Sequence, residues 1–451
     1  MELKLSEAAA MLGVRFAGDD TVVQRVSTDS RSLQPGDLFI ALRGARFDGG
    51  VYAEDALKQG AAGVVLDWTQ APGVAQAIRV DDTRLALGRL ASAWRARFDL
   101  PVVALTGSNG KTTVKEMLAS ILRVETGDAE AVLATEGNLN NDIGVPQMLL
   151  RLRPQHRFAV FEMGMNHAGE IDYLTRLARP DVALVNNALT AHIGNLGSVE
   201  AIARAKGEIF NGLPDAGIAV INADDPHAPL WRAANVERIV VDFGQNADAR
   251  VRGEIEARAF GSRLAIHLPN ATLDVELAMP GVHNAMNALA AAALAFTLDV
   301  DHRSIVAGLA AFTGVKGRLQ RKPAQHGSTL IDDTYNANPD SVKAALAVLA
   351  AQPGRKLLVL GDMGELGEEA AAMHREIGQA AREAGIHRLL ALGELTQETV
   401  AAFGHGAMHF DTLEDLLAEL EHALGPDTTV LVKGSRFMKM ERVVTRFLET
   451  H

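Results

Sequence analysis

A glycine turn between an apolar strand and a helix, at Leu105 to Thr113, limits the possible folds of this chain most strongly. Residues 101–105, before the turn, form a short run with β-branched side chains that is typical of a buried parallel strand. Residues 114–122, after the turn, carry apolar side chains at helical spacing. In this setting the backbone N–H groups of the turn and the positive end of the helix face the same point. The stretch therefore predicts a binding site for nucleotide phosphates.

Individual side chains of this loop suit that chemistry. Gly107 and Gly110 permit the turn, the Lys111 ammonium can reach the β- and γ-phosphates, and the Thr112 hydroxyl can bind a magnesium ion. The spacing is unusual, because the general phosphate-loop pattern has a glycine where Leu105 stands. An ordinary turn with a solvated Lys111 is the alternative, and the complete strand–loop–helix context argues against it.

Length and composition exclude several classes of protein. The 451 residues suffice for about three domains of roughly 150 residues each. A formal charge of −12 argues against nucleic-acid binding, and the absence of cysteine excludes disulfides and thiolate metal sites. The first seven residues lack the layout of a signal peptide, and the longest apolar run, 288–296, is shorter than the ~20 residues of a membrane span. We expect a cytoplasmic protein without membrane insertion.

The alternation of strand-like and helical patterns predicts an α/β protein of three domains. Residues 1–82 form a first unit of short mixed elements. Residues 83–314 form a central, doubly wound and mostly parallel sheet with the phosphate loop, and alternating segments near 251–277 suggest a small antiparallel addition. Residues 315–451 form a third, Rossmann-like unit without a second phosphate loop. The glycines of 314–317 mark a hinge before it.

One side chain of the central unit is a candidate for metal binding, and two others stand in polar segments of the same unit. Glu162 closes an apolar strand beside the phosphate loop, where it can hold the magnesium ion that Thr112 also contacts. A carboxylate that points into solvent is the alternative. His192 follows another strand in a polar loop, and Lys206 lies in a helical pattern. On their own, both are typical of solvated surface residues.

Polar segments elsewhere are candidates for substrate binding. The cluster 27–31 combines hydroxyl, carboxylate and guanidinium groups that can bind a ribose, a uracil edge or a diphosphate, although composition alone favours an ordinary polar turn. The amides of 137–144 can bind a polar substrate. Asn284 and Asn287 stand one helical turn apart and can contact a nucleobase, and the carboxylates of 332–341 can hold a ribose. Helix capping is the alternative for Asn284. The carboxylates of 332–341 can equally hold a partner arginine, and a capped loop is the alternative for that segment.

Together these motifs resemble those of the Mur ligase family, the ATP-dependent amino-acid and peptide ligases of peptidoglycan synthesis. The shortened phosphate loop is usual in that family. The resemblance covers essentially the whole chain and rests on residues 27–31, 106–112, 137–141, 162–167, 205–210, 332–341 and 432–436. It implies the branch of the family that joins D-alanyl-D-alanine to UDP-N-acetylmuramoyl-tripeptide through an acyl phosphate, and we expect a monomer.

The resemblance also implies roles for individual residues. ATP would be bound by Gly107, Asn109, Gly110, Lys111, Thr112, Thr113, Asn287, Arg318 and Asp333. Two Mg²⁺ ions would be held by Thr112, Glu162, His192 and Lys206, the last as a carbamate, which replaces a repelling cation with oxygen ligands. Lys111, His192 and Lys206 would serve catalysis. The substrates would be bound by Ser30, Arg31, Asp48, Asn138, Asn141, Tyr335, Asn336, Asn338 and Lys433.

Two other interpretations stay open at this point. One is a related ligase of the diaminopimelate-adding or folylpolyglutamate type. The first usually carries an Asp-Asn-Pro-Arg motif that this chain lacks, and the second would not keep an N-terminal UDP-binding unit. The other is a nucleotide-switched protein that hydrolyses ATP without forming a bond. Dependence of phosphate release on both peptide substrates distinguishes it from a ligase.

Overall fold

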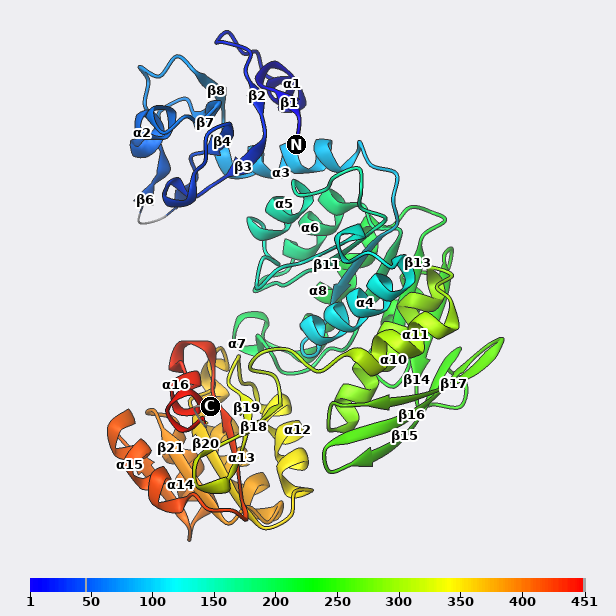
Figure 1. Cartoon of the computed structure of the whole chain (residues 1–451), viewed down its shortest axis with the longest axis vertical. Helices are drawn as coiled ribbons and strands as arrows, with labels where there is room; N and C mark the ends of the chain where they lie inside the picture. Colours follow the sequence, from blue (N-terminus) through cyan, green and yellow to red (C-terminus); the bar gives the residue numbers. More distant parts are fainter. Residues whose placement is uncertain (45–46, 449–451) are drawn as a thin grey trace.

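The computed structural model describes residues 1–44 and 47–448, in which three sheet-centred units follow one another along the chain (Figure 1). The sheet of the first unit is parallel and consists of β3 (Arg25–Ser27), β4 (Asp37–Ile40), β7 (Gly63–Asp67) and β8 (Ala77–Val80). Helix α1 (Leu5–Met11) packs on one face of this sheet and α2 (Ala53–Lys58) on the other. Two short antiparallel pairs complete it: β1 (Leu3–Lys4) with β2 (Val22–Val23), and β5 (Arg43–Gly44) with β6 (Phe47–Asp48).

Helix α3 (Thr83–Arg95) connects the first unit to the central one (Figure 1). Its start is fixed by Asp82, whose carboxylate accepts hydrogen bonds from the backbone N–H groups of Arg84 and Leu85. Leu87, Leu90 and Trp94 on its inner face join the core of the central unit. The helix is therefore tied to the sheet that carries the phosphate loop.

The central sheet is mixed, as expected, with its strands in the order β10-β11-β9-β12-β13-β14-β15-β16-β17. The parallel part contains β10 (Val132–Ala134), β11 (Phe158–Glu162), β9 (Val102–Thr106), β12 (Val182–Val185), β13 (Ile218–Asn222) and β14 (Ile239–Gly244). The predicted antiparallel addition is β15 (Val251–Arg258), β16 (Gly261–Leu268) and β17 (Ala271–Leu277), and it continues the same sheet beyond β14. Strand β14 was not predicted.

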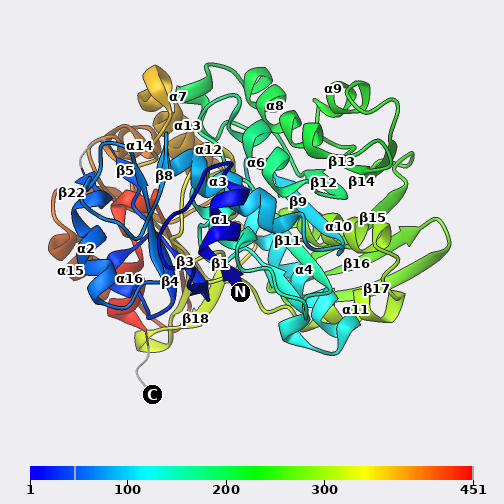
Figure 2. The same ribbon diagram turned by 90° about the horizontal axis from the view of Figure 1, so that it is seen from above.

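Helices cover both faces of this sheet, which confirms the doubly wound prediction. One face carries α4 (Lys111–Thr126), α10 (Val282–Thr297) and α11 (His302–Ala311). The other carries α3, α5 (Gly144–Leu149), α6 (Glu170–Ala178), α8 (Val199–Gly207) and α9 (Ala228–Ala233) (Figure 2). Strand β9 lies inside and is buried throughout, as a parallel strand between two helix layers must be.

The chain changes direction across the sheet at β9. After β9 it builds β10 and β11 on one side, and then β12 and the following strands on the other. Loops that leave the carboxyl ends of β9 and β12 therefore diverge and open a crevice, which is where doubly wound sheets bind ligands. The phosphate loop leaves β9 at this crevice.

The third unit has the predicted alternation of strands and helices. Its strands run β18 (Gln320–Pro323), β19 (Thr329–Asp333), β23 (Thr428–Lys433), β20 (Arg355–Gly361), β21 (Arg388–Leu392) and β22 (Ala407–Phe410), all parallel except β18. One face is covered by α12 (Pro339–Ala350), α13 (Ala370–Glu383) and α14 (Thr396–Phe403), the other by α15 (Leu413–Ala423) and α16 (Glu441–Phe447). Gly314 and Gly317, in the linker before β18, have φ of 113° and 71°, which non-glycine residues rarely adopt.

Among the described residues, no helix combines the length and apolar character that a membrane crossing requires.

Candidate functional site

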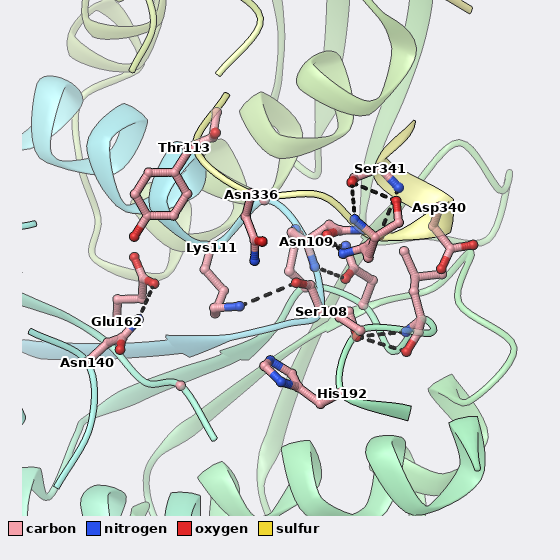
Figure 3. Close-up of a pocket in the computed structure, with 18 of the residues that line it drawn as sticks. Ser108, Asn109, Lys111, Thr113, Asn140, Glu162, His192, Asn336, Asp340 and Ser341 are labelled. Atoms are coloured by element: carbon pink, nitrogen blue, oxygen red, sulfur yellow. Dashed lines mark hydrogen bonds between the residues drawn. The ribbon is translucent and has the colours of Figure 1, made fainter. Parts of the chain in front are cut away.

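A cavity of about 780 Å³ opens at the carboxyl ends of β9, β11 and β12, and loops of the third unit line its other side (Figure 3). Most of the predicted site residues line it: Asn109, Gly110, Lys111, Thr113, Asn138, Asn141, Glu162, His192, Asn287, Arg318, Asp333, Tyr335, Asn336, Asn338 and Lys433. Gly107, Thr112 and Lys206 are not among its lining residues. The first unit contributes none of its described residues to the lining.

The phosphate loop is held by asparagine side chains from the loop that follows β12, the neighbour of β9 in the sheet. The backbone N–H of Asn109 donates to Asn187 Oδ1 at 2.9 Å, and Asn186 Nδ2 donates to the Asn109 carbonyl at 3.0 Å. Gly110 has φ of 82°, and a Cβ there would lie 2.2 Å from Asn287 Oδ1, so both conformation and space require glycine. Sequence analysis missed Asn186 and Asn187, which carried only the weak signal of polar residues after a strand.

Lys111 is the first residue of α4 and lies between Glu162 and Asn109 in Figure 3. Its Nζ donates to the Gly107 carbonyl at 2.6 Å. Burial lowers the pKa of Lys111, the nearby Glu162 carboxylate opposes that shift, and the Arg318 guanidinium adds to it. A cation held in a partly desolvated loop interacts strongly with an incoming polyanion.

Thr112 and Glu162 are in direct contact at the base of the cavity. Thr112 Oγ1 donates to Glu162 Oε2 at 2.8 Å, and Asn140 Nδ2 donates to Glu162 Oε1 at 2.8 Å. Glu162 is 3% exposed, and none of the ion pairs among the described residues includes it. A buried carboxylate whose partners are neutral is costly unless a cation accompanies it.

The residues present fit a magnesium ion of the kind that phosphates complete. In the described part of the chain, no group of three or more His, Asp or Glu side chains converges on a point. Magnesium in nucleotide enzymes is usually bound by one or two carboxylates, water and substrate phosphates rather than by a full protein cage. The Thr112 hydroxyl and the Glu162 carboxylate are hard oxygen donors of this kind.

His192 faces a carboxylate of the third unit that sequence analysis missed. His192 Nδ1 lies 2.7 Å from Glu365 Oε2, although without the angle of a hydrogen bond. The backbone N–H of Gly194 donates to the Glu365 carbonyl at 3.0 Å. His192 and Glu365 have φ of 68° and 62°, conformations that are uncommon for residues with a Cβ. Both residues of this contact between the two units therefore have an uncommon backbone conformation.

Lys206 is buried near the end of α8, where it is 1% exposed. Burial lowers its pKa well below the ordinary value, and the positive charge of Lys111 lowers it further. Lys206 takes part in none of the ion pairs that the described residues, 1–44 and 47–448, form with one another. The solvated-lysine alternative is therefore wrong, and a buried amine with a lowered pKa is a chemically reactive group.

Arg318 and Asp333 have partners that were not expected. The Arg318 guanidinium lies 4.3 Å from the centre of the Tyr335 ring, and its Nη2 donates to Thr112 Oγ1 at 2.9 Å. This places the guanidinium at the phosphate end of the site. Asp333 Oδ2 lies 2.6 Å from Lys433 Nζ, so these two predicted residues form a buried ion pair.

Two further contacts join the central and third units around the cavity. Asn338 caps α12 and donates through Nδ2 to Asn109 Oδ1 at 2.8 Å. Asp340 Oδ2 accepts from the Thr190 hydroxyl at 2.5 Å and from its backbone N–H at 2.9 Å. The third unit is thus bonded directly to the phosphate loop and to the loop after β12.

The predicted residues of the first unit are engaged locally and away from the cavity. Arg31 pairs with Asp29 at 2.8 Å, and this contact lowers the pKa of Asp29 to about 2. Asp48 accepts from the Gly50 backbone N–H, from Gln70 and from Arg43. Both carboxylates thus hold turns in place, and Ser30 lies at the start of the single helical turn that Asp29 caps.

The structure also places an unpredicted ion pair in the cavity wall. Arg84, in the first turn of α3, and Asp142, in the loop after β10, both line the cavity. Arg84 Nη2 donates to Asp142 Oδ1 at 2.8 Å, and its Nε donates to Asp142 Oδ2. The two residues are far apart in the chain, so no local pattern could have joined them.

Comparison with known proteins relates the chain to one family throughout. It matches the Mur ligase middle domain over residues 105–295, the glutamate ligase domain of Mur ligases over 317–436, and the catalytic domain of the Mur ligase family over 22–95. It is 43% identical to UDP-N-acetylmuramoyl-tripeptide–D-alanyl-D-alanine ligase of Escherichia coli K12, covering 100% of this chain and 99% of that one.

Two solved structures share the fold over nearly the full length. One is UDP-N-acetylmuramoylalanyl-D-glutamyl-2,6-diaminopimelate–D-alanyl-D-alanyl ligase from Acinetobacter baumannii, with 35% identity, a TM-score of 0.88 and coverage of 99% of this chain and 98% of that one. The other is MurF ligase from Thermotoga maritima in complex with ADP, with 27% identity, a TM-score of 0.84 and coverage of 94% and 96%.

Proposed function

This chain belongs to the Mur ligase family, and from that membership we propose how its residues carry out the reaction. It is an ATP-dependent ligase that joins D-alanyl-D-alanine to UDP-N-acetylmuramoyl-tripeptide in peptidoglycan synthesis. The observation that carries the residue assignments is the Thr112–Glu162 pair beside Lys111, in a cavity that the third unit completes.

ATP binds with its phosphates on the loop 107–113. The ADP complex of the Thermotoga maritima relative supports nucleotide binding by this fold. The backbone N–H groups at the start of α4 and the Lys111 ammonium bind the β- and γ-phosphates. Asn287, Arg318 and Asp333 line the cavity beyond the loop, and we assign them to the nucleotide.

Thr112 and Glu162 hold one magnesium ion, and His192 with Lys206 serves a second. When bound, the ions neutralise the charges that would otherwise keep phosphate and carboxylate groups apart. The buried Glu162 with its neutral partners supports the first assignment. The burial of Lys206, together with its lowered pKa, supports a carbamate on its Nζ, because an uncharged amine can react with carbon dioxide.

The reaction proceeds in two transfers. A carboxylate oxygen of the tripeptide attacks the γ-phosphorus, the bond to the bridging oxygen of ADP breaks, and an acyl phosphate forms. The amine of D-alanyl-D-alanine then attacks the acyl carbon, a C–N bond forms, phosphate leaves, and the amine loses a proton. Lys111 stabilises the transferring phosphoryl group, as a cation positioned by the loop can.

The three units divide the substrates between them. The first unit, 1–82, binds the UDP end through Ser30, Arg31 and Asp48, the central unit binds ATP, and the third unit, 315–451, binds the dipeptide. The contacts of Asn338 with Asn109 and of Asp340 with Thr190 support a third unit that closes over the nucleotide. We also propose that the protein is a cytoplasmic monomer.

The test measures phosphate release and product mass with purified protein, ATP, magnesium, the tripeptide nucleotide and D-alanyl-D-alanine. A ligase releases phosphate in proportion to product, and only when both peptide substrates are present. Phosphate release at the same rate without either peptide would instead support the ATP-hydrolysing switch. Lys58→Ala, at an exposed lysine far from the cavity, is the control for substitution in itself.

A further inference from the structure

Arg84 and Asp142 form an accessible ion pair of which both members line the cavity. The side chains of Arg84 and Asp142 are 51% and 31% exposed. By contrast, the Asp333–Lys433 pair of the third unit is almost fully buried, with side-chain exposures of 12% and 3%. Of these two pairs, only Arg84–Asp142 can be reached by a ligand without breaking up a packed core.

The other acidic side chains that line the cavity face partners of their own. Glu162 bonds to Thr112, Asp340 to Thr190, Glu365 faces His192, and Glu170 accepts from the backbone N–H of Asn166. These contacts fix the loops of the site. The Arg84–Asp142 contact joins two side chains across the cavity wall and caps no helix.

Both members of the pair are held in place by their backbones. Arg84 follows the Asp82 cap, and Asp142 follows Asn141, whose Oδ1 accepts from the Gly144 N–H at the start of α5. An arginine in the first turn of a helix lies at the positive end of the helix dipole, which is unfavourable for a cation. A residue placed against this preference needs another reason for its position.

The pair lies on the route that the tripeptide must take. The UDP end belongs to the first unit, and the reacting carboxylate must reach Lys111. Helix α3, which carries Arg84, connects the two units. Gln147 of α5, which follows shortly after Asp142 in the chain, donates through Nε2 to the Thr28 hydroxyl of the first unit at 2.6 Å. The side chain of the third peptide residue branches from the carbon beside the reacting carboxylate, so it enters the cavity that Lys111, Arg84 and Asp142 line together.

We propose that Arg84 and Asp142 form a subsite for a zwitterionic side chain on the third residue of the tripeptide, the second amino-acid centre of 2,6-diaminopimelate. The proposal rests on the ligase function given above. The side-chain carboxylate takes the Arg84 guanidinium, and the side-chain ammonium takes the Asp142 carboxylate. Four alternating charges then replace two, and every charge keeps an opposite partner.

A lysine side chain does not fit this pair in the same way. It brings an ammonium without a carboxylate, so it competes with Arg84 for Asp142 and leaves one cation with a weaker partner. A subsite made of an ion pair therefore selects a side chain that carries both charges. The relative from Acinetobacter baumannii is named for a substrate with 2,6-diaminopimelate, which is the chemistry that this subsite suits.

The experiment compares tripeptide nucleotides that end in diaminopimelate or in lysine, with the wild-type protein, Arg84→Gln and Asp142→Asn. We expect the wild type to favour diaminopimelate at least about tenfold in kcat/KM, and Arg84→Gln to raise KM for that substrate about tenfold by loss of a bidentate contact. The same variant should leave KM for the lysine substrate unchanged or lower it, because Asp142 becomes free for the ammonium. Asp142→Asn should weaken both substrates.

Arg89→Gln is the matched control, because Arg89 is an exposed arginine of the same helix that does not line the cavity. Calorimetric binding of ADP shows that each variant is folded. Equal use of both substrates by the wild type, or an equal loss for both in Arg84→Gln, overturns the subsite while leaving the ligase function in place. No product with either substrate overturns the ligase function and the subsite with it.

Discussion

The phosphate site of the central unit and the cluster 27–31 of the first unit begin from the same local design, a parallel strand followed by a polar loop and a helix start. Strand β9 leads into the phosphate loop, and β3 leads into residues 28–31. Their surroundings differ. The phosphate loop is bonded by residues more than seventy positions away, whereas Asp29 and Arg31 bond to each other.

This difference shows what turns a polar loop into a site. Around the phosphate loop, Asn187 and Asn338 come from separate loops, and their bonds leave the cavity between them. In the cluster 27–31, Asp29 and Arg31 bond to each other, and 88% of the Arg31 side chain is accessible. The first arrangement is preorganised for an anion. The second must exchange its partners when a ligand binds.

The largest effect is expected for Lys111→Ala. The substitution removes the cation that the loop directs at the phosphates, and we expect ligation to fall by at least about a thousandfold while the midpoint of thermal unfolding changes little. Product formation by mass spectrometry measures it, with Lys58→Ala as the control. Ligation near the wild-type rate would contradict the assignment of this loop as the phosphate site.

Lys206→Ala should also lose most of the activity, but in a way that can be restored. Acetate or formate can occupy the space that the side chain leaves and supply oxygen ligands, so partial recovery is expected. A ¹³C carbamate signal in wild-type protein prepared with labelled carbon dioxide, absent from the variant, is an independent measurement. A free amine at Lys206 in protein loaded with magnesium and nucleotide would rule the modification out.

Glu365→Gln tests whether the contact between units matters beyond packing. The change keeps the shape of the side chain and removes the charge beside His192, so we expect kcat to fall about tenfold with little change in stability. Small-angle scattering with nucleotide bound should show a larger radius of gyration if the contact helps closure. Glu368→Gln, on the exposed turn that follows, is the control and should behave as wild type.

The smallest effect on stability is expected for Arg31→Ala in the first unit. Because the ion pair with Asp29 is exposed and screened by solvent, its loss should change the free energy of unfolding at pH 7 very little. Calorimetry should nevertheless show weaker binding of the UDP substrate, by about tenfold, if Arg31 contacts the diphosphate. Unchanged binding would leave the cluster 27–31 as an ordinary turn.

The same ion pair has a defined pH dependence. The folded pKa of Asp29, about 2, lies below the ordinary value of 3.8, so the stability that the pair contributes is present above pH 3.8 and is lost as the pH falls toward 2. In Arg31→Ala the pKa of this carboxyl should rise toward its ordinary value and stay somewhat below it, because the backbone N–H of residue 31 still donates to Asp29 Oδ1. NMR titration of the Asp29 carboxyl carbon measures both, and an unchanged pKa in the variant would contradict the assignment of the shift to Arg31.

Local sequence patterns determined much of the fold because they report interactions between near neighbours. Apolar periodicity predicted β9, α13 and most other elements of the central and third units. Glycines at positive φ, such as Gly110, marked the turns. The two strands that were missed in the third unit have a common cause. β18 and β22 lie at sheet edges with side chains that are mostly partly exposed, so their residues carry little apolar signal.

Site residues could be predicted from the sequence where the residue type is unusual for its position. They could not be predicted where their role depends on burial or on a partner from a distant segment. Glu162 could be recognised because a carboxylate is unusual at the end of an apolar strand, and in the structure it contacts Thr112. The burial of Lys206, the facing of His192 and Glu365, and the Arg84–Asp142 pair depend on segments that only the folded chain brings together. The sequence by itself determined which chemistry the loops can offer. Which charges are desolvated, and which side chains meet, is set by contacts between distant segments, because local patterns carry no information about them.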